Sequence, residues 1–418
     1  MIRTLLLADH RQRDTAPLTA IQYYLEKRPD FDVQVVSFDL HQQALELFQP
    51  HVVVVNHLHG NRNQGIADKV RRRGGLCVVL PTEGRPNTWD QVRWATQEFP
   101  PELCDLYLSW SDEFSKHLPA QIARTVTGGP KFDFYFFPLC GLLTSREELR
   151  GRVGLLPEDN VCTIAPAAPQ AKFAIQGGAF HIADWKDLKV TTIPGREDPH
   201  QTALDEYAVL SKMQEWLKVL SVAWKGKIVV SPHPAESVNL WEKFCYENNI
   251  TLVLGWPIWD VLAISDIHLP RSNCLTICDA WFMNKPTIFL RLGRDKEGPA
   301  QDAQDWSDFI YSPSQFFNLF LERQNYMSDG RQRYLKKWLS PGYGACERIA
   351  DAIAKLIEDN KPVVEFTPTL EMLCQLSKAI NDHDKHVSEN PIDFAGQYQK
   401  SVRQRDIEEW QIKLRSVL

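Results

Sequence analysis

The sequence predicts an α/β protein with two consecutive Rossmann-like domains that face each other across a cleft. Three observations support this fold class. The chain has 418 residues, which is enough for two domains of ordinary size. Short, almost wholly apolar runs of strand length alternate with longer helix-like stretches, which is typical of parallel sheets covered by helices. This alternation occurs in the first 135 residues and again from residue 161.

The first half contains six apolar runs of strand length. These predicted strands cover residues 4–8, 33–38, 52–56, 76–80, 106–110 and 125–127. Helical spacing or composition predicts helices at residues 18–27, 42–48, 65–73 and 89–96. No Gly-x-Gly-x-x-Gly follows the first strand, so the fingerprint of a dinucleotide-binding dehydrogenase is absent.

The second half repeats this architecture after a charged helix candidate. Strands or buried stretches are predicted at residues 161–164, 227–231, 250–254, 264–270 and 287–290, and helices at residues 205–224, 237–248 and 275–283. Residues 170–203 have weak periodicity, which indicates an irregular insertion. We expect an N-terminal acceptor domain in residues 1–150, a nucleotide-binding domain in residues 151–368, and C-terminal helices in residues 369–418 that pack on the body.

Composition and charge exclude several classes of protein. With 44% hydrophobic and 24% charged residues, the chain is an ordinary globular protein. The net charge of −6 is spread along the chain, which argues against nucleic acid as a partner. The first apolar run ends at Asp9 and His10, too early for a secretory signal, and no apolar window is long enough for a transmembrane helix. The nine cysteines lie mostly in apolar stretches and are interpreted as reduced thiols of a cytoplasmic protein.

The C-terminal segment carries one apolar stripe at helical spacing, formed by Ile407, Trp410, Leu414 and Val417. Such a stripe usually packs on the body of the protein. The alternative is attachment to the anionic inner face of a membrane, because basic residues accompany the stripe. Peripheral membrane association of a cytoplasmic protein is therefore the second interpretation.

Glu83 follows the predicted strand at residues 76–80, in the segment Thr82-Glu83-Gly84-Arg85. Ligands of parallel sheets bind beyond the carboxyl ends of the strands. A carboxylate held there by a tight turn and partly desolvated has its pKa raised toward the range of a general base. Glu83 is therefore a candidate base, and the alternative is a turn carboxylate that accepts backbone N–H groups.

His233 follows the predicted strand at residues 227–231 and lies between Pro232 and Pro234. The two prolines restrict the backbone on both sides, so the imidazole is presented in a rigid turn. A helix beginning near Glu236 would direct its N–H groups and its positive dipole end at the cleft, which suits a nucleotide phosphate. The alternative is an ordinary histidine in a proline-rich turn.

Ser272, Asn273, Thr276 and Asp279 follow the buried stretch at residues 264–270. Ser272 is expected to cap the next helix, while the N–H groups of its first turn and Thr276 face an anion. The spacing places Ser272, Thr276 and Asp279 on one helix face, where Asp279 could accept from ribose hydroxyls. The alternative is a capped helix without a ligand.

Two further segments follow strands of the first half. The glycines of Gly128-Gly129-Pro130-Lys131 permit close approach of the backbone to a ligand, or they only turn the chain. His57 could line the acceptor side, although a loop histidine is usually just solvated.

No metal site is predicted. Cys274 and Cys278 are four residues apart, but no second Cys or His pair has zinc-binding spacing. The Asp-x-Asp at residues 382–384 is far in sequence from the cleft motifs, which agrees with a metal-independent site.

As an ordered set, the motifs resemble the GT-B glycosyltransferases of bacterial surface-polysaccharide assembly. The resemblance is to the group around capsule polysialyltransferases, Kdo transferases and teichoic-acid glycerophosphotransferases. Thr82-Glu83-Gly84 resembles their acidic-acidic-Gly element, with Thr82 in place of the first acid, and His233-Pro234 resembles their His-Pro element.

Two other segments carry the same resemblance. Residues 272–276 resemble the Ser/Thr element of that group. Residues 110–112 (Trp-Ser-Asp) and 127–133 (Thr-Gly-Gly-Pro-Lys-Phe-Asp) resemble a recurring sequence of surface-carbohydrate biosynthesis proteins, with Gly129 where asparagine is usual.

The resemblance implies the GT-B fold and transfer of a sugar from a nucleotide donor to a glycan or glycolipid acceptor of capsule or lipopolysaccharide. In that family the acid before glycine is the catalytic base, which falls on Glu83 here. The phosphate of the nucleotide is held by the His-Pro and Ser/Thr elements, which implies His233, Ser272 and Thr276. The implied donor is a cytidine nucleotide, CMP-linked (Kdo or sialic-acid type) or CDP-linked, and neither a cofactor nor a metal is implied.

Two groups of site residues are therefore expected. The nucleotide side comprises His233, Pro234, Ser272, Asn273, Thr276 and Asp279, and the acceptor side comprises His57, Gly84, Arg85, Gly128, Gly129 and Lys131. Three other functions stay open. A CDP-glycerol or CDP-ribitol phosphotransferase shares the His-Pro and Ser/Thr elements. A noncatalytic binding protein of the same fold is favoured by Thr82, and a nucleotide-sugar 2-epimerase also has two facing α/β domains.

Overall fold

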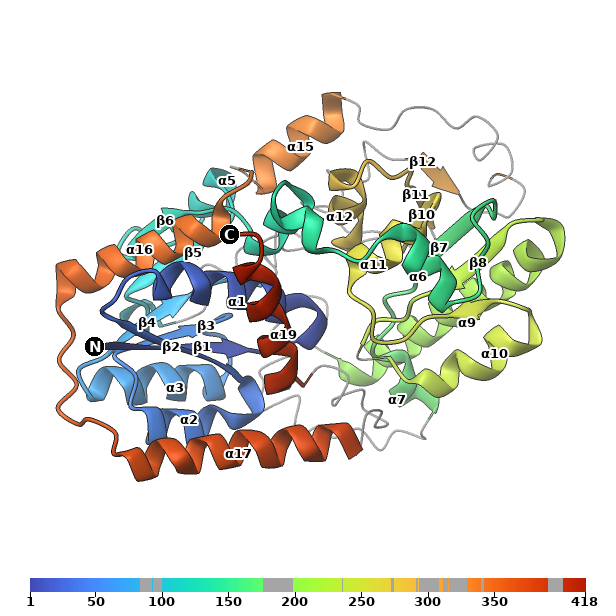
Figure 1. Ribbon diagram of the computed structural model, residues 1–418. Helices are drawn as coiled ribbons and strands as arrows, with labels where there is room; N and C mark the ends of the chain where they lie inside the picture. Colours follow the sequence, from blue (N-terminus) through green and yellow to red (C-terminus); the bar gives the residue numbers. More distant parts are fainter. Residues whose placement is uncertain are drawn as a thin grey trace.

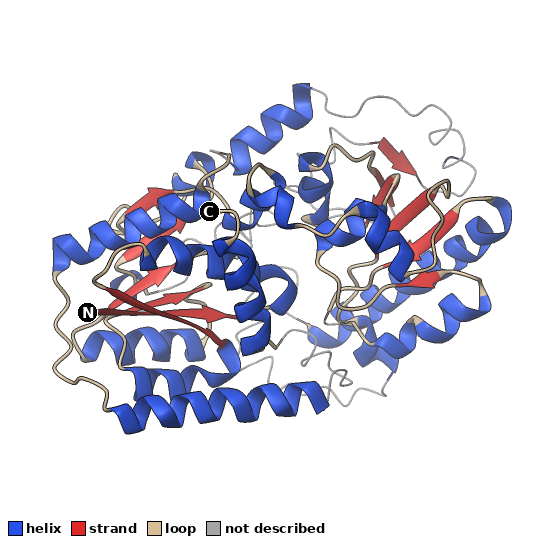
Figure 2. Cartoon of the chain, in the orientation of Figure 1, coloured by secondary structure: helices blue, strands red, loops and turns tan. Residues whose placement is uncertain are grey.

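The computed structural model describes residues 1–82, 92, 100–175, 198–234, 236–271, 274–290, 292, 308–310, 315, 329–339, 342–389 and 401–418. Two parallel β-sheets, each covered by helices, form the two halves of the molecule (Figures 1 and 2). The predicted α/β fold with two Rossmann-like domains is confirmed.

The first sheet has six parallel strands in the order β2-β1-β3-β4-β5-β6. Their bounds are Ile2–Ala8 (β1), Phe31–Ser37 (β2), Val52–Val55 (β3), Leu76–Val79 (β4), Leu106–Ser109 (β5) and Arg124–Val126 (β6). Successive side chains alternate between two buried faces of the sheet. This double burial explains why the strands contain so few polar residues.

Helices cover both faces of the first sheet. Helix α1 (Arg11–Glu26) packs on one face, and α2 (His41–Phe48) and α3 (Asn61–Arg72) pack on the other. Helix α1 begins well before residue 18, where the sequence predicted its start. The first turn begins at Arg11, where the carboxylate of Asp14 accepts the backbone N–H of His10, and Pro17 lies inside the helix.

The second sheet has four parallel strands in the order β10-β7-β8-β9. Their bounds are Val161–Ala165 (β7), Lys227–Val230 (β8), Thr251–Leu252 (β9) and Ile267–Pro270 (β10). Single bridges from His268 to Thr287 and from Arg271 to Leu290 connect β10 to a further pair of parallel strands. That pair is β11 (Ile288–Leu290) and β12 (Asp308–Ile310).

Helices also cover the second sheet on both faces. One face carries α7 (Ala171–Ile175), α9 (Pro199–Ala223) and α10 (Glu242–Glu247), and the other carries α6 (Arg146–Arg152) and α11 (Ile258–Ile264). Helix α12 (Thr276–Phe282) packs against α15 (Asp329–Leu339) in a separate aromatic cluster, and the short α5 (Asp112–Ser115) also contacts α15.

The C-terminal helices return to the first sheet (Figure 1). Helices α16 (Ala345–Asn360) and α19 (Gln404–Arg415) pack against α1, and α17 (Leu370–Glu389) packs against α2. Ile407 and Leu414 of the predicted apolar stripe are buried in this packing. Helix α16 therefore contacts the first domain although it lies inside the range 151–368, and the domain boundaries stay predictions. Within the described ranges, no helix combines the length and the hydrophobicity needed to cross a bilayer.

Aromatic side chains join the two halves of the molecule. Phe134 of the first half stacks on Trp259 of α11, with 5.6 Å between ring centroids. Trp410 of α19 meets Phe134 edge-to-face at 5.2 Å. Because these rings belong to one buried cluster, the two sheets are held in a defined relative position by core packing.

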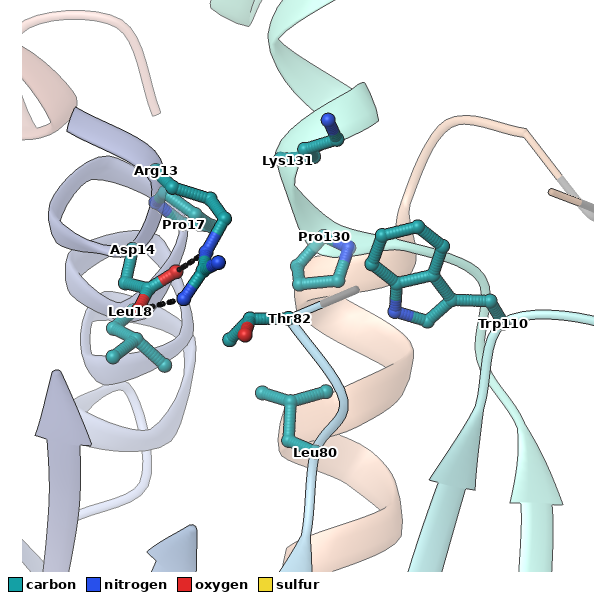
Figure 3. Close-up of a pocket in the computed structure, with 9 residues that line it drawn as sticks. All are labelled: Arg13, Asp14, Pro17, Leu18, Leu80, Thr82, Trp110, Pro130 and Lys131. Atoms are coloured by element: carbon teal, nitrogen blue, oxygen red, sulfur yellow. Dashed lines mark hydrogen bonds and ion pairs between the residues drawn. The ribbon is translucent and has the colours of Figure 1, made fainter. Parts of the chain in front are cut away.

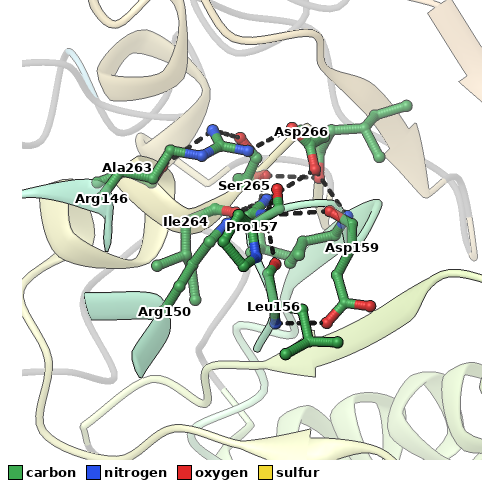
Figure 4. A network of polar contacts seen from close by, with 12 residues as sticks. Arg146, Arg150, Leu156, Pro157, Asp159, Ala263, Ile264, Ser265 and Asp266 are labelled. Atoms are coloured by element: carbon green, nitrogen blue, oxygen red, sulfur yellow. Dashed lines mark hydrogen bonds and ion pairs between the residues drawn. The ribbon is translucent and has the colours of Figure 1, made fainter. Parts of the chain in front are cut away.

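Arg150 of α6 connects the N-terminal ends of strands β7 and β10 in the second sheet (Figure 4). Its buried guanidinium donates to four backbone carbonyl oxygens and, at 2.9 Å, to the carboxylate of Asp266. Asp266 also accepts from Arg146 at 2.6 Å and from the N–H of Val161 at 2.8 Å. Burial raises the pKa of Asp266, but these donors outweigh it and the pKa lies below its ordinary value.

We expect Asp266→Ala to lower the free energy of unfolding by about 3 to 5 kcal/mol, because it leaves the buried charge of Arg150 without its partner. Arg152→Met is the matched control, since Arg152 pairs with Glu148 where both side chains are about half exposed. That change should cost about 0 to 1 kcal/mol. Equal losses in the two variants, measured by thermal unfolding, would contradict the role assigned to Arg150.

Candidate functional site

The strand order of the first sheet reverses beside β1. The chain runs from β1 outward to β2 and then returns to the other side of β1 to form β3. The loops after β1 and β3 therefore diverge, and ligands of open parallel sheets bind in the crevice at such a point. Asp9 and His10 follow β1, and Asn56 and His57 follow β3.

His10 and His233 face each other from the two sheets. His10 follows β1 and His233 follows β8, and their ring centroids are 6.4 Å apart at an interplanar angle of 71°. A second pair of loops meets nearby, because a Cβ atom on Gly255, after β9, would lie 3.7 Å from Nε2 of Gln12 in α1. The carboxyl ends of the two sheets thus come together at one place.

Glu236 holds the turn that presents His233. Its buried carboxylate accepts the backbone N–H of His233 at 3.2 Å and that of Ala168 at 2.7 Å. It also accepts from the indole N–H of Trp241 at 2.8 Å. Burial raises the pKa of Glu236 to about 7, although the three N–H donors act in the opposite direction.

The helix expected to begin near Glu236 begins later. A 3-10 turn at Val238–Leu240 precedes α10, whose first residue is Glu242. His233, Pro234 and Glu236 instead belong to a turn, which the buried carboxylate of Glu236 stabilises. The prediction that a helix N-terminus lies directly beside His233 is therefore wrong.

Asp14 holds the loop of His10 in a similar way. Its buried carboxylate accepts the backbone N–H of His10 at 2.9 Å and that of Asp9 at 3.2 Å. Burial raises the pKa of Asp14, and the guanidinium of Arg13, which donates to it at 2.7 Å, acts in the opposite direction. Each of the two histidines is thus positioned by a buried carboxylate that binds its backbone N–H.

A small pocket lies beside this point (Figure 3). Its lining residues are Arg13, Asp14, Pro17, Leu18, Leu80, Thr82, Trp110, Pro130 and Lys131. Its volume of about 10 Å³ is room for roughly one water molecule. Thr82 lines the pocket, so the predicted acidic motif begins here. Glu83, Gly84 and Arg85 themselves lie outside the described residues.

Lys131 and Asp279 form a buried ion pair between the two halves. The ammonium nitrogen of Lys131 lies 3.0 Å from Oδ2 of Asp279 and points away from Thr82 (Figure 3). The hydroxyl of Tyr135 donates to Oδ1 of Asp279 at 2.7 Å. Both carboxylate oxygens already have one protein donor and the side chain is almost fully buried, and contact of Asp279 with a ribose stays a prediction.

The two glycines before Lys131 are required by the local structure. Gly128 has a φ angle of +84°, which favours glycine. A Cβ atom on Gly129 would lie 2.8 Å from the ring of Phe132 and 3.0 Å from that of Trp110, so packing excludes a side chain. Contact of either glycine with a ligand stays a prediction.

Asp133, the last residue of the segment at residues 127–133, binds the start of α16. Its carboxylate accepts the N–H groups of Gly344 at 2.9 Å, Ala345 at 3.0 Å and Cys346 at 2.8 Å, at the start of α16. Burial raises the pKa of Asp133, and these N–H groups oppose that effect. The segment at residues 127–133 thus joins the first domain to α12 and to α16.

Thr276 is the first residue of α12. The N-cap position is Leu275, and no side-chain hydrogen bond caps the helix. The prediction that Ser272 caps this helix is therefore wrong, because the helix begins four residues after it; Ser272 and Asn273 themselves lie outside the described residues. The hydroxyl oxygen of Thr276 lies 3.1 Å from Nε2 of the buried His268.

His57 is exposed and lies, like His10, at the carboxyl ends of the strands of the first sheet. Its ring stacks on His59, with the centroids 5.9 Å apart, and its carbonyl oxygen accepts from Asn63 at 2.7 Å. His57 is thus located where an acceptor could reach it, and its role stays a prediction.

Among the described residues, no three His, Cys, Asp or Glu side chains lie together so that they could hold a metal ion. In the Asp-x-Asp at residues 382–384, Asp384 accepts the N–H of Gln404 at 2.9 Å. His383 lies 3.5 Å from the carboxylate of Asp39. This motif fastens α17 to α19 and to the first domain.

Reasoning from the sequence missed His10 and Asp14. His10 directly follows the first strand, which is the position that drew attention to Glu83 and His233, so the signal was present. Asp14 lies in the first turn of the next helix, where the helix dipole favours an acidic side chain.

The pKa of Glu236 predicts a dependence of stability on pH. Because folding raises this pKa from 4.5 to about 7, the contribution of Glu236 to stability is complete below pH 4.5 and is lost as the pH rises to about 7. In total it amounts to at most about 3 kcal/mol. Thermal unfolding across this range should show the loss in the wild type and in Glu242→Gln, a control on an exposed glutamate. In Glu236→Gln this component should be missing, and an unchanged pH profile would contradict the assignment.

No protein-family model and no curated protein matches the chain. Solved structures do match. The S. aureus MnaA–UDP structure has 12% sequence identity and a TM-score of 0.53, covering 86% of this chain and 97% of that one. The wall teichoic acid polymerase TagF has 13% identity and a TM-score of 0.52, covering 86% and 89%. A TagF variant soaked with CDPG has 12% identity and a TM-score of 0.51, covering 87% and 90%. At such identities the likeness concerns the fold, and the chain has the GT-B fold.

Proposed function

We propose that this protein is a glycosyltransferase that transfers a sugar from a cytidine-nucleotide donor to a glycan acceptor of the bacterial surface. The observation that carries the proposal is the pair His10 and His233, 6.4 Å apart between ring centroids and contributed by the carboxyl ends of two facing sheets. A transferase needs one group for the departing phosphate and one for the incoming hydroxyl. His233 is proposed for the phosphate and Glu83 for the hydroxyl, and the histidine pair supports the proposal because it places the carboxyl ends of the two sheets close to each other.

The donor side of the proposal rests on His233. Its imidazole follows β8 in a turn restricted by two prolines and by the carboxylate of Glu236. A rigid N–H donor is suited to stabilise the charge that develops on a departing phosphate, because it needs no reorganisation at the moment of reaction. The sequence resemblance assigns the same role to His233.

The acceptor side of the proposal assigns the base to Glu83, which follows Thr82 at the pocket of Figure 3. The acceptor oxygen attacks the anomeric carbon and gives its proton to the carboxylate of Glu83. The bond from the anomeric carbon to the phosphate oxygen breaks, and its electron pair leaves with CMP. His10 is the imidazole on this side that faces His233.

The choice of a cytidine nucleotide rests on the resemblance. Two proteins of the same fold agree with a pyrimidine nucleotide, since one is a complex with UDP and the other was soaked with CDPG. The proposed reaction takes place in the cytoplasm, with the acceptor at the inner face of the membrane. Attachment through α19 is not part of the proposal, because Ile407 and Leu414 are buried against the body.

A CDP-glycerol or CDP-ribitol phosphotransferase is the second candidate, favoured by the likeness to TagF. In that reaction the acceptor oxygen attacks phosphorus, and the bond between the two phosphates of the donor breaks. Both reactions release CMP, so the donor consumed distinguishes them. Binding of a nucleotide without turnover of any donor would instead indicate a noncatalytic protein.

The first test is a thermal-shift panel of CMP, CDP, UDP, GDP and ADP. A ligand that binds only the folded state at a hundred times its Kd stabilises that state by about 2.7 kcal/mol, which raises the melting temperature. The proposal expects a shift with CMP or CDP and little shift with the purine nucleotides. Stabilisation by GDP or ADP alone would contradict it.

The second test is His233→Ala. Loss of a hydrogen bond to a charged phosphate should weaken CMP affinity about 10- to 100-fold in calorimetry. His200→Ala is the control, because His200 is exposed at the start of α9. Equal affinities of the His233 variant and the wild type would remove His233 from the phosphate site.

The third test is Glu83→Gln. It should lower the turnover number about 10²- to 10⁴-fold while leaving CMP affinity nearly unchanged, because only the base is lost. Unchanged turnover would rule out Glu83 as the base.

A further inference from the structure

A chain of hydrogen-bonded side chains runs from the interior of the second sheet to Thr276. It begins at Ser265, passes through Thr163 of β7 and His268 of β10, and ends at the first residue of α12. Ser265, Thr163 and His268 are fully buried, whereas Thr276 is half-buried. Each hydroxyl has a single proton, so the direction of every bond in the chain can be assigned.

The direction is fixed at the inner end. The hydroxyl of Ser265 lies 2.7 Å from the carbonyl oxygen of Ile267, which can only accept, so Ser265 donates there. The hydroxyl of Thr163, 2.9 Å from that of Ser265, must then donate to Ser265. With its proton used, Thr163 can only accept from His268, whose Nδ1 lies 2.9 Å away.

His268 is therefore protonated at Nδ1. Burial lowers its pKa to about 3, so the ring is neutral near pH 7 and Nε2 carries no proton. Nε2 accepts from the hydroxyl of Thr276 at 3.1 Å. The sulfur of Cys274 lies 3.1 Å from the same hydroxyl and is a second, weaker acceptor for its proton; with either acceptor, the proton of Thr276 is used within the protein.

We propose that this chain holds the hydroxyl of Thr276 as a hydrogen-bond acceptor, so that Thr276 binds a hydroxyl group of the donor substrate and not a phosphate oxygen. The inference rests on the proposed function, because it takes Thr276 to be part of the nucleotide-sugar site. A phosphate oxygen is itself an acceptor and gains nothing from a hydroxyl whose proton points to His268. The hydroxyl that it binds belongs to the ribose or to the transferred sugar.

The first half of the inference is tested without any ligand. The tautomers of the 12 histidines are measured by long-range ¹⁵N–¹H NMR near pH 7, and His268 is assigned by the loss of its signal in His268→Asn. We expect His268 to be neutral with the proton on Nδ1. In Thr163→Val the acceptor of that proton is gone, and the proton should move to Nε2. A wild-type ring that is charged, or protonated at Nε2, would overturn the inference.

The second half is tested by calorimetry with Thr276→Val and three probes: CMP, CMP-sialic acid and pyrophosphate. We expect the variant to weaken binding of at least one of the first two about 3- to 10-fold, with pyrophosphate unchanged. Weaker CMP binding identifies a ribose hydroxyl, and a loss confined to CMP-sialic acid identifies a sugar hydroxyl. An equal loss with pyrophosphate, or no loss with any probe, would overturn the inference.

Two controls distinguish a loss of binding at Thr276 from a general effect of a Thr-to-Val change and from misfolding. Thr202→Val makes the same change at the start of α9, where the hydroxyl donates to a backbone carbonyl at 2.8 Å, and it should leave all three affinities unchanged. Melting temperatures of all variants show whether they fold. If the wild type binds none of the probes, the proposed function fails, while the NMR result still decides the state of His268.

Discussion

The buried contact between the two sheets is the constraint on which the site depends. Lys131 of the first half and Asp279 of the second form an ion pair with little exposure, and Phe134 of the first half stacks on Trp259 of the second. Such a pair adds little net stability, but breaking it leaves an uncompensated buried charge. The contact therefore favours one relative position of the sheets, and in that position His10 faces His233.

His10 and His233 are positioned by the same kind of interaction. In each case a buried carboxylate, Asp14 or Glu236, accepts the backbone N–H of the histidine and of a second residue. Both carboxyl groups are almost fully buried, and this burial raises the pKa of each. A site whose backbone is held in this way needs little reorganisation when charge develops, which is what a transfer reaction requires.

Reasoning from the sequence recovered the strands well because strands buried on both faces are nearly free of polar residues. It was least accurate at the starts of two helices. Helix α1 begins at Arg11, before the predicted residue 18, and the turn held by Glu236 places the start of α10 at Glu242, after the predicted residue 237. The pair Lys131–Asp279 joins residues that are 148 positions apart, so no local pattern could reveal it. The same holds for α16, whose apolar stripe gives no indication of which sheet it packs on.

The proposed function requires that one nucleotide contacts residues from both sheets at the same time. The most direct test follows the imidazole signals of assigned histidines by NMR while CMP is added. We expect the signals of His10 and His233 to shift together with the same apparent Kd, whereas the signal of His200 on α9 should not respond. Shifts at only one of the two rings, or at neither while CMP binds, would contradict the claim that the two sheets form a single site.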